Sequence, residues 1–179
     1  AETLRDLNFV ASVENAVVLI KQLPPTNRIQ RLQSKDMSLF ANHDAWQPYI
    51  QVLSEHLNPS HLTHLSLLAR NSRCYQVSDS GDVDREAPTL NITPLLRFSL
   101  LQTLELELDD NIYLTAEDLD AIASALPNIL HLSFVPALQS WHAEDLRTPR
   151  IDIAHVRAFA SRLPFLETLK IVFDASHVL

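Results

Sequence analysis

A triplet of apolar residues with a fixed internal spacing recurs along this chain, and it constrains the fold more than any other feature. In each copy, the second and third members lie three and five positions after the first. The copies are Ile29, Leu32 and Ser34 (a degenerate one); Leu62, Leu65 and Leu67; Leu101, Leu104 and Leu106; Ile129, Leu132 and Phe134; and Leu166, Leu169 and Ile171. The shortest step between first members is 28 residues, from Leu101 to Ile129, and the longest is 39, from Leu62 to Leu101. Repetition at this interval is typical of chains built from stacked structural units.

A helix-like segment precedes each triplet. Residues 115–126 give the clearest example, because their apolar side chains recur at helical spacing. Thr115 and Asp118 fit a capping box at the start of this segment, and Pro127 ends it. Further helices are expected over residues 12–22 and 46–57, over a short stretch around Leu95 and Leu96, and over residues 153–163.

These helix, turn and strand units predict an α/β fold, specifically a leucine-rich-repeat solenoid of about five repeats in one domain, residues 1–179. Stacked units place a parallel sheet on the concave side and the helices on the outside. The longest gaps, residues 69–91 and 136–150, are expected to be insertions at the rim. Neither end carries a polar capping unit, and the chain begins at Ala1 rather than at a methionine, so we expect a fragment of a longer protein.

The composition narrows the classes of function. The 179 residues are 46% apolar and 20% charged, which is typical of a folded protein large enough to bury a core. A net charge of −8 argues against a nucleic-acid partner, and no apolar run is long enough to cross a membrane. A single cysteine, Cys74, favours a reducing compartment, the cytoplasm or the nucleus. A single glycine, Gly81, leaves no means of building a glycine-rich phosphate loop, so we expect no enzyme activity and no cofactor.

Two groups of possible metal ligands fail on spacing. His61 and His64 are three residues apart, which in a strand places the two rings on opposite faces. Asp82, Asp84 and Glu86 are spaced like the start of a calcium loop, but the glycine and the final glutamate that such a loop requires are missing. We therefore expect no metal site, and we interpret residues 71–90 as an acidic surface loop.

The residues between the leucines of each strand are the candidate partner-binding positions. Because side chains alternate across a strand, the third, fifth and seventh positions of each unit face away from the helices. These positions hold Arg31, Gln33 and Lys35; His64, Ser66 and Leu68; Thr103, Glu105 and Glu107; His131, Ser133 and Val135; and Thr168, Lys170 and Val172. Across the sheet the charge passes from basic through acidic to mixed. Leu68, Val135 and Val172 are expected to form a small apolar strip that anchors a protein partner.

Several short motifs in the second half of the chain carry a resemblance to a known family. They are Ile92–Phe98, Thr115–Ala123, Leu126–Leu132, Leu163–Leu169 and Phe173–Ala175. Through them, residues 91–175 resemble the repeat region of the F-box-like leucine-rich-repeat proteins that are numerous in mushroom-forming fungi. Residues 28–70 are similar to that region more loosely.

The resemblance implies an intracellular substrate receptor of a ubiquitin ligase. In such proteins the F-box holds the adaptor of a cullin-RING ligase, and the repeats select the protein to be ubiquitinated. No F-box is visible in this sequence, because the Leu-Pro pairs that begin at Leu23, Leu126 and Leu163 all lie at helix ends inside repeats. Adaptor and cullin are therefore expected as partners only if an F-box lies upstream. The alternative interpretation is a leucine-rich-repeat scaffold with no role in ubiquitination.

Overall fold

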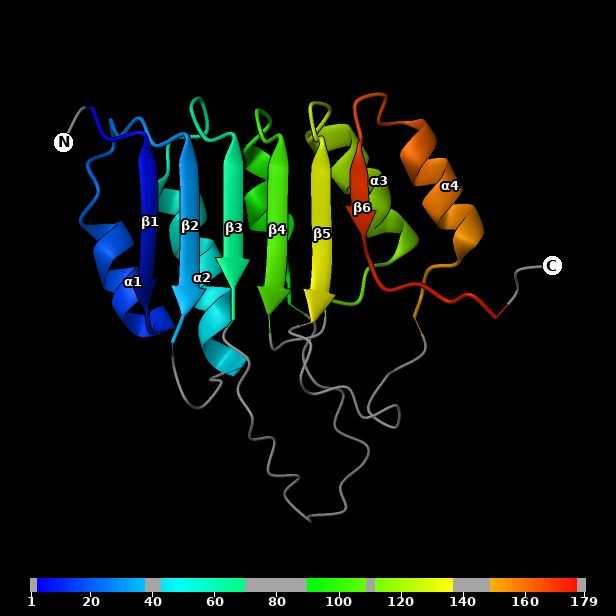
Figure 1. Cartoon of the computed structure of the whole chain (residues 1–179), viewed down its shortest axis with the longest axis horizontal. Helices are drawn as coiled ribbons and strands as arrows, with labels where there is room; N and C mark the ends of the chain where they lie inside the picture. The colour runs from blue at the N-terminus through cyan, green and yellow to red at the C-terminus, as the bar shows by residue number, and fades with distance from the viewer. Residues whose placement is uncertain (1–2, 38–42, 70–89, 109–111, 137–148, 177–179) are drawn as a thin grey trace, which may run out of the picture.

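The computed structural model describes residues 3–37, 43–69, 90–108, 112–136 and 149–176. Six parallel strands form one sheet, and their order in space is their order in the sequence (Figure 1). The strands are β1 (Asp6–Ala11), β2 (Arg31–Asp36), β3 (His64–Leu68), β4 (Thr103–Leu108), β5 (His131–Pro136) and β6 (Thr168–Lys170). The predicted α/β class with a parallel sheet is therefore confirmed.

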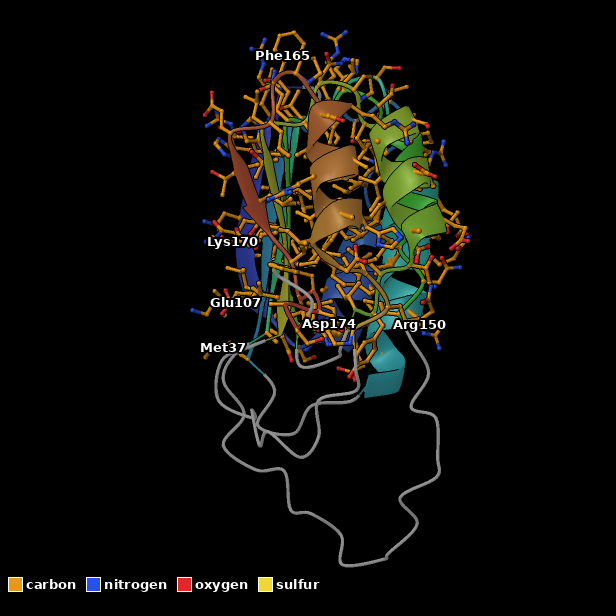
Figure 2. All side chains as sticks on the ribbon, turned by 90° about the vertical axis from the view of Figure 1, so that its right-hand side faces the viewer. Met37, Glu107, Arg150, Phe165, Lys170 and Asp174 are labelled. Atoms are coloured by element: carbon orange, nitrogen blue, oxygen red, sulfur yellow. The ribbon has the colours of Figure 1, made fainter. Side chains whose placement is uncertain are left out.

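Helices cover one face of this sheet, and the chain has two layers. They are α1 (Val13–Lys21), α2 (His43–His56), the short 3₁₀ helix η1 (Thr93–Arg97), α3 (Ala116–Ala125) and α4 (Ile153–Ser161). In Figure 1 they lie behind the strands, and the side view in Figure 2 separates the strands on the left from the helices on the right. Each helix lies close to the position expected from the sequence. Parallel neighbouring strands require a crossover connection, and in this fold the helices supply it.

The leucine triplets set the register of the sheet. Leu32 pairs with Leu65, Leu65 with Leu104, and Leu104 with Leu132, so the second members form one continuous row beneath the helices. Each of these four side chains is at most 1% exposed. Burying a leucine to this extent stabilises the fold by about 2 kcal/mol relative to an exposed one. The predicted register of β2 to β5 is therefore confirmed.

Strand β1 was not predicted from the triplets. Its sequence carries the same spacing, with Leu4, Leu7 and Phe9 as the apolar members. Leu7 pairs with Leu32 and Phe9 with Ser34. Unlike the other triplets, this one is not preceded by a helix-like segment, so the pattern of a helix followed by a triplet does not predict it.

The entry into each strand is closed by the same backbone hydrogen bonds, which shows that the units stack with one geometry. The amides of Gln30 and Arg31 both donate to the carbonyl of Arg5, at 2.7 and 3.0 Å. Equivalent pairs of amides donate to the carbonyls of Gln30, Thr63, Gln102 and Leu130. Every acceptor directly follows the first member of its triplet, and Arg5 follows Leu4 in the same way. These hydrogen bonds therefore join β1 to β2 with the same geometry that joins the later strands.

A buried side-chain amide ties the first two helical units together. Asn27, which is 2% exposed, lies in the turn between α1 and β2. Its Nδ2 donates to the carbonyl oxygen of Pro24 and to that of His56, both at 2.9 Å. Because His56 is the last residue of α2, one side chain closes its own turn and also satisfies the end of the neighbouring helix.

Helix α3 begins with the predicted capping box. The backbone amide of Asp118 donates to Thr115 Oγ1 at 3.2 Å, and the backbone amide of Thr115 donates to Asp118 Oδ2 at 2.9 Å. Two amides that have no partner inside the helix are thus satisfied. Helix α4 uses the same device with Asp152 and His155, and the hydrogen bond from the His155 backbone amide holds the pKa of the Asp152 carboxyl below its usual value.

Replacing Thr115 with alanine is expected to lower the free energy of unfolding by about 1 kcal/mol, because the Asp118 amide loses its acceptor. A denaturant titration followed by circular dichroism measures this change. The matched control is Thr26→Ala in an exposed turn, which is expected to change the free energy of unfolding far less. Equal losses in the two variants would contradict the capping role of Thr115.

Candidate partner-binding surface

The sheet face opposite the helices carries the candidate site, and we call it the open face. Within the described ranges no helix lies over it, and Figure 2 shows Glu107 and Lys170 on the side of the sheet away from the helices. Its residues are Asp6, Asn8 and Val10 on β1; Arg31, Gln33 and Lys35 on β2; His64, Ser66 and Leu68 on β3; Thr103, Glu105 and Glu107 on β4; His131, Ser133 and Val135 on β5; and Thr168 and Lys170 on β6. The structure therefore brings fourteen of the fifteen predicted positions together on one strand face.

Basic and acidic strands alternate across the open face, with a strand free of lysine, arginine and carboxylate side chains between β2 and β4 and between β4 and β6. Arg31 and Lys35 make β2 basic, and both are exposed. Glu105 and Glu107 make β4 acidic, and Lys170 on β6 is basic again. Strand β3 lies between β2 and β4 and carries no carboxylate, lysine or arginine on this face. The order of charge expected from the sequence is thus also the order in space.

Glu105 is held in position by a neighbouring strand. Its Oε2 accepts a hydrogen bond of 2.8 Å from Ser66 Oγ on β3. The two residues are direct register partners, so the hydrogen bond is between adjacent strands. A hydrogen bond to an ionised group is stronger than one between neutral groups, and here it draws the carboxylate toward β3.

His64 is the histidine of this face whose protonation is perturbed. Partial burial lowers its pKa below the usual value, the positive charge of Arg31 lowers the pKa further, and the carboxylate of Asp6 opposes both effects. Its Nδ1 lies 2.8 Å from Thr63 Oγ1. The lowered pKa favours the neutral form of the ring.

The predicted apolar strip is interrupted. The register places Glu107 between Leu68 on β3 and Val135 on β5, so these two side chains are not neighbours. Val172 lies beyond the last residue of β6, where the strand pairing with β5 has ended. The expected strip of Leu68, Val135 and Val172 was therefore wrong. The expectation did not take into account that β4, with Glu107, lies between β3 and β5.

Ser133 lies between two charged residues on the neighbouring strands. It pairs with Glu105 on one side and with Lys170 on the other. Its side chain belongs to the open face but is only 7% exposed, and its hydroxyl has no hydrogen-bond partner. The longer side chains beside Ser133 cover its short side chain. Ser133 therefore lies at a shallow depression of the open face and does not offer its side chain to a partner. The sequence pattern alone gave no sign of this.

Strand β1 extends the open face beyond the predicted positions. Val10 is 55% exposed and pairs in register with Lys35, while Asp6 pairs with Arg31. The signal that could have found them is the Leu4, Leu7 and Phe9 spacing, which implies Asp6, Asn8 and Val10 on the opposite side of the strand.

Other kinds of site receive no support from the parts of the chain that are described. Among those residues, no group of three or more His, Cys, Asp or Glu side chains is placed to hold a metal ion. None of the described helices has the length and apolar character that crossing a membrane requires. Cys74 and the calcium-like spacing of residues 82–86 lie outside the described residues.

No family model matches the sequence, and neither the curated proteins nor the solved structures contain a match to it.

Proposed function

We propose that this chain is a leucine-rich-repeat solenoid that binds a protein partner on its open face. The observation that carries the proposal is the open face itself, an ordered array of exposed and partly exposed polar and charged side chains, with the helices of the described segments on the other side of the sheet. The strict sequential strand order and the repeated hydrogen bonds at each strand entry support the solenoid. In this proposal the open face is the concave face, and its alternating charge favours a protein over a nucleic acid.

We further propose that the repeats select the substrate of an F-box-type ubiquitin ligase in the cytoplasm or nucleus. The support is the resemblance of residues 91–175, which includes the capping box of α3 and the turn at Pro127. The alternative remains a repeat scaffold with no role in ubiquitination. The two differ in whether the adaptor and the cullin accompany the bound protein.

Site-specific photo-crosslinking tests the binding face. A photoreactive phenylalanine analogue is placed at Gln33, an exposed open-face residue, and in a matched variant at Ala121, an exposed residue of α3. Both are introduced into the protein in its own cells. We expect the same defined partner to be covalently attached at position 33 and not at position 121. Attachment at position 121 alone would overturn the proposed binding face.

Mass spectrometry of the same samples separates the two roles. Adaptor and cullin recovered with the crosslinked partner support the ligase receptor. A partner crosslinked at position 33 without adaptor or cullin contradicts the ligase role and leaves the protein-binding scaffold.

A further inference from the structure

The charges that flank β3 constrain what the open face can bind. Lys35, Leu68 and Glu107 form one row across β2, β3 and β4, with the apolar side chain between a cation and an anion. Two further rows cross the same three strands. One has Arg31 at its β2 end, and the other has Glu105 at its β4 end. Strand β3 is thus a neutral track with a basic border and an acidic border.

From this arrangement we propose that the occupant of the open face is an α-helix of the partner, lying along β3, with acidic side chains toward β2 and basic side chains toward β4. This inference rests on the proposed function, because it specifies the partner of the same surface. The proposed occupant is a single helix with one acidic and one basic flank.

The dimensions of the track match a helix. Neighbouring strands are separated by about 4.8 Å, so β2 and β4 are about 10 Å apart. A helix with its side chains is about 10 to 12 Å wide, so one helix reaches both borders. An extended segment lying flat on side chains would leave its own backbone groups unpaired, whereas a helix satisfies them internally.

Distances along the strands set the spacing of the partner's charges. Arg31 and Lys35 are four residues apart, which is about 13 Å along a strand. Acidic residues seven apart on one helix flank are separated by about 10.5 Å, and long basic side chains span the difference. Glu105 and Glu107 are about 6.6 Å apart, which matches basic residues four apart on the other flank, at about 6 Å.

Two further contacts favour this orientation. Leu68 is only partly buried and lies on the midline of the track, where it contacts an apolar side chain on the underside of the helix. Ser66 draws the Glu105 carboxylate toward the track through the 2.8 Å hydrogen bond, so the acidic border is oriented before the partner arrives. Less side-chain entropy is then lost on binding.

Designed helical peptides of about 20 residues, stapled to keep them helical, are suitable probes. The test peptide carries two glutamates seven apart on one flank, two lysines four apart on the other, and a leucine between the flanks. All-glutamate and all-lysine versions have the same length and staple. Fluorescence anisotropy at low salt is expected to show tightest binding of the test peptide, and the preference is expected to shrink at high salt because exposed charges are screened.

Charge reversal on the protein is the decisive step. Arg31→Glu with Lys35→Glu is expected to weaken binding of the test peptide roughly tenfold, since two attractive pairs become repulsive. Adding Glu105→Lys and Glu107→Lys is expected to transfer tight binding to a charge-swapped peptide with two lysines seven apart and two glutamates four apart, because its spacing matches the exchanged borders. The control, Arg28→Glu with Arg157→Glu, makes the same charge change at exposed positions outside the open face and is expected to leave binding unchanged.

The outcomes separate this inference from the proposed function. Equal binding of the three peptides, or no effect of Arg31→Glu with Lys35→Glu, overturns the two-flank helix while crosslinking at position 33 still supports the binding face. Failure of crosslinking at position 33 overturns the binding face, and this inference with it. A quadruple variant that melts like the parent chain but binds the charge-swapped peptide no more tightly than the test peptide also overturns the inference.

Discussion

Replacing Leu132 with aspartate is expected to unfold the chain, lowering the free energy of unfolding by about 4 kcal/mol or more. Leu132 is fully buried on the helix side of β5, paired with Leu104 and Leu169. A carboxylate at this position is surrounded by leucine side chains and has no partner to offset its loss of hydration. A denaturant titration followed by circular dichroism measures the change.

The matched control is Glu105→Lys, on the opposite face of the adjacent strand. Glu105 is only partly buried and lies on the open face, so we expect the variant to fold with a free energy of unfolding within about 1 kcal/mol of the parent. Unchanged melting of Leu132→Asp would show that residue 132 does not face the helices. The register described above would then be wrong.

Replacing Asn27 with aspartate is expected to be nearly as damaging, at about 3 kcal/mol or more at pH 7. The two side chains have the same shape, but the amide nitrogen that donates to the carbonyls of Pro24 and His56 becomes an oxygen. A buried carboxylate would then face two carbonyl oxygens. Thermal and denaturant unfolding at pH 7 measure the loss.

The pH dependence of this variant gives an internal check. Burial and the facing carbonyls raise the folded-state pKa of the new carboxyl above its unfolded value of about 4. Its penalty is therefore smallest below that unfolded pKa, grows as the pH rises from the unfolded pKa to the folded pKa, and is constant above the folded pKa. Asn27→Ala removes the donor without adding a charge, and its loss of about 1 to 3 kcal/mol is expected to be independent of pH. An Asn27→Asp variant as stable as the parent at pH 7 would contradict the described hydrogen bonds.

The spacing of the leucine triplets was enough to predict the class of fold, the helix positions and the register of the inner strands. It succeeded because a slip of one residue would move every leucine of a strand to the solvent side. It also placed Arg31, Lys35, Glu105 and Glu107 on one face, because side-chain direction in a strand follows directly from position.

Three features of the open face could not be predicted from the sequence. They depend on the side chains of the neighbouring strands and not on the position of a residue within its own strand. The apolar strip failed because Glu107 of β4 stands between Leu68 and Val135. The burial of Ser133 depends on the size of its neighbours, and the Ser66 to Glu105 hydrogen bond depends on side-chain conformation. Strand β1 was missed for a different reason, since its triplet is present in the sequence but is not preceded by a helix.

The strand order has a consequence for how the chain comes apart. In the described segments, contacts between elements are made chiefly between each strand and the next strand along the chain, and between each helix and the next helix. Leu65, Leu104 and Leu132 are fully buried in the middle of the sheet, whereas Leu7 and Leu169 in the two edge strands are only partly buried. Such a chain behaves as a one-dimensional row in which each unit is supported by the next. Opening is then expected to begin at either edge strand and to advance inward, so the inner strands β2 to β5 are expected to be the last to open.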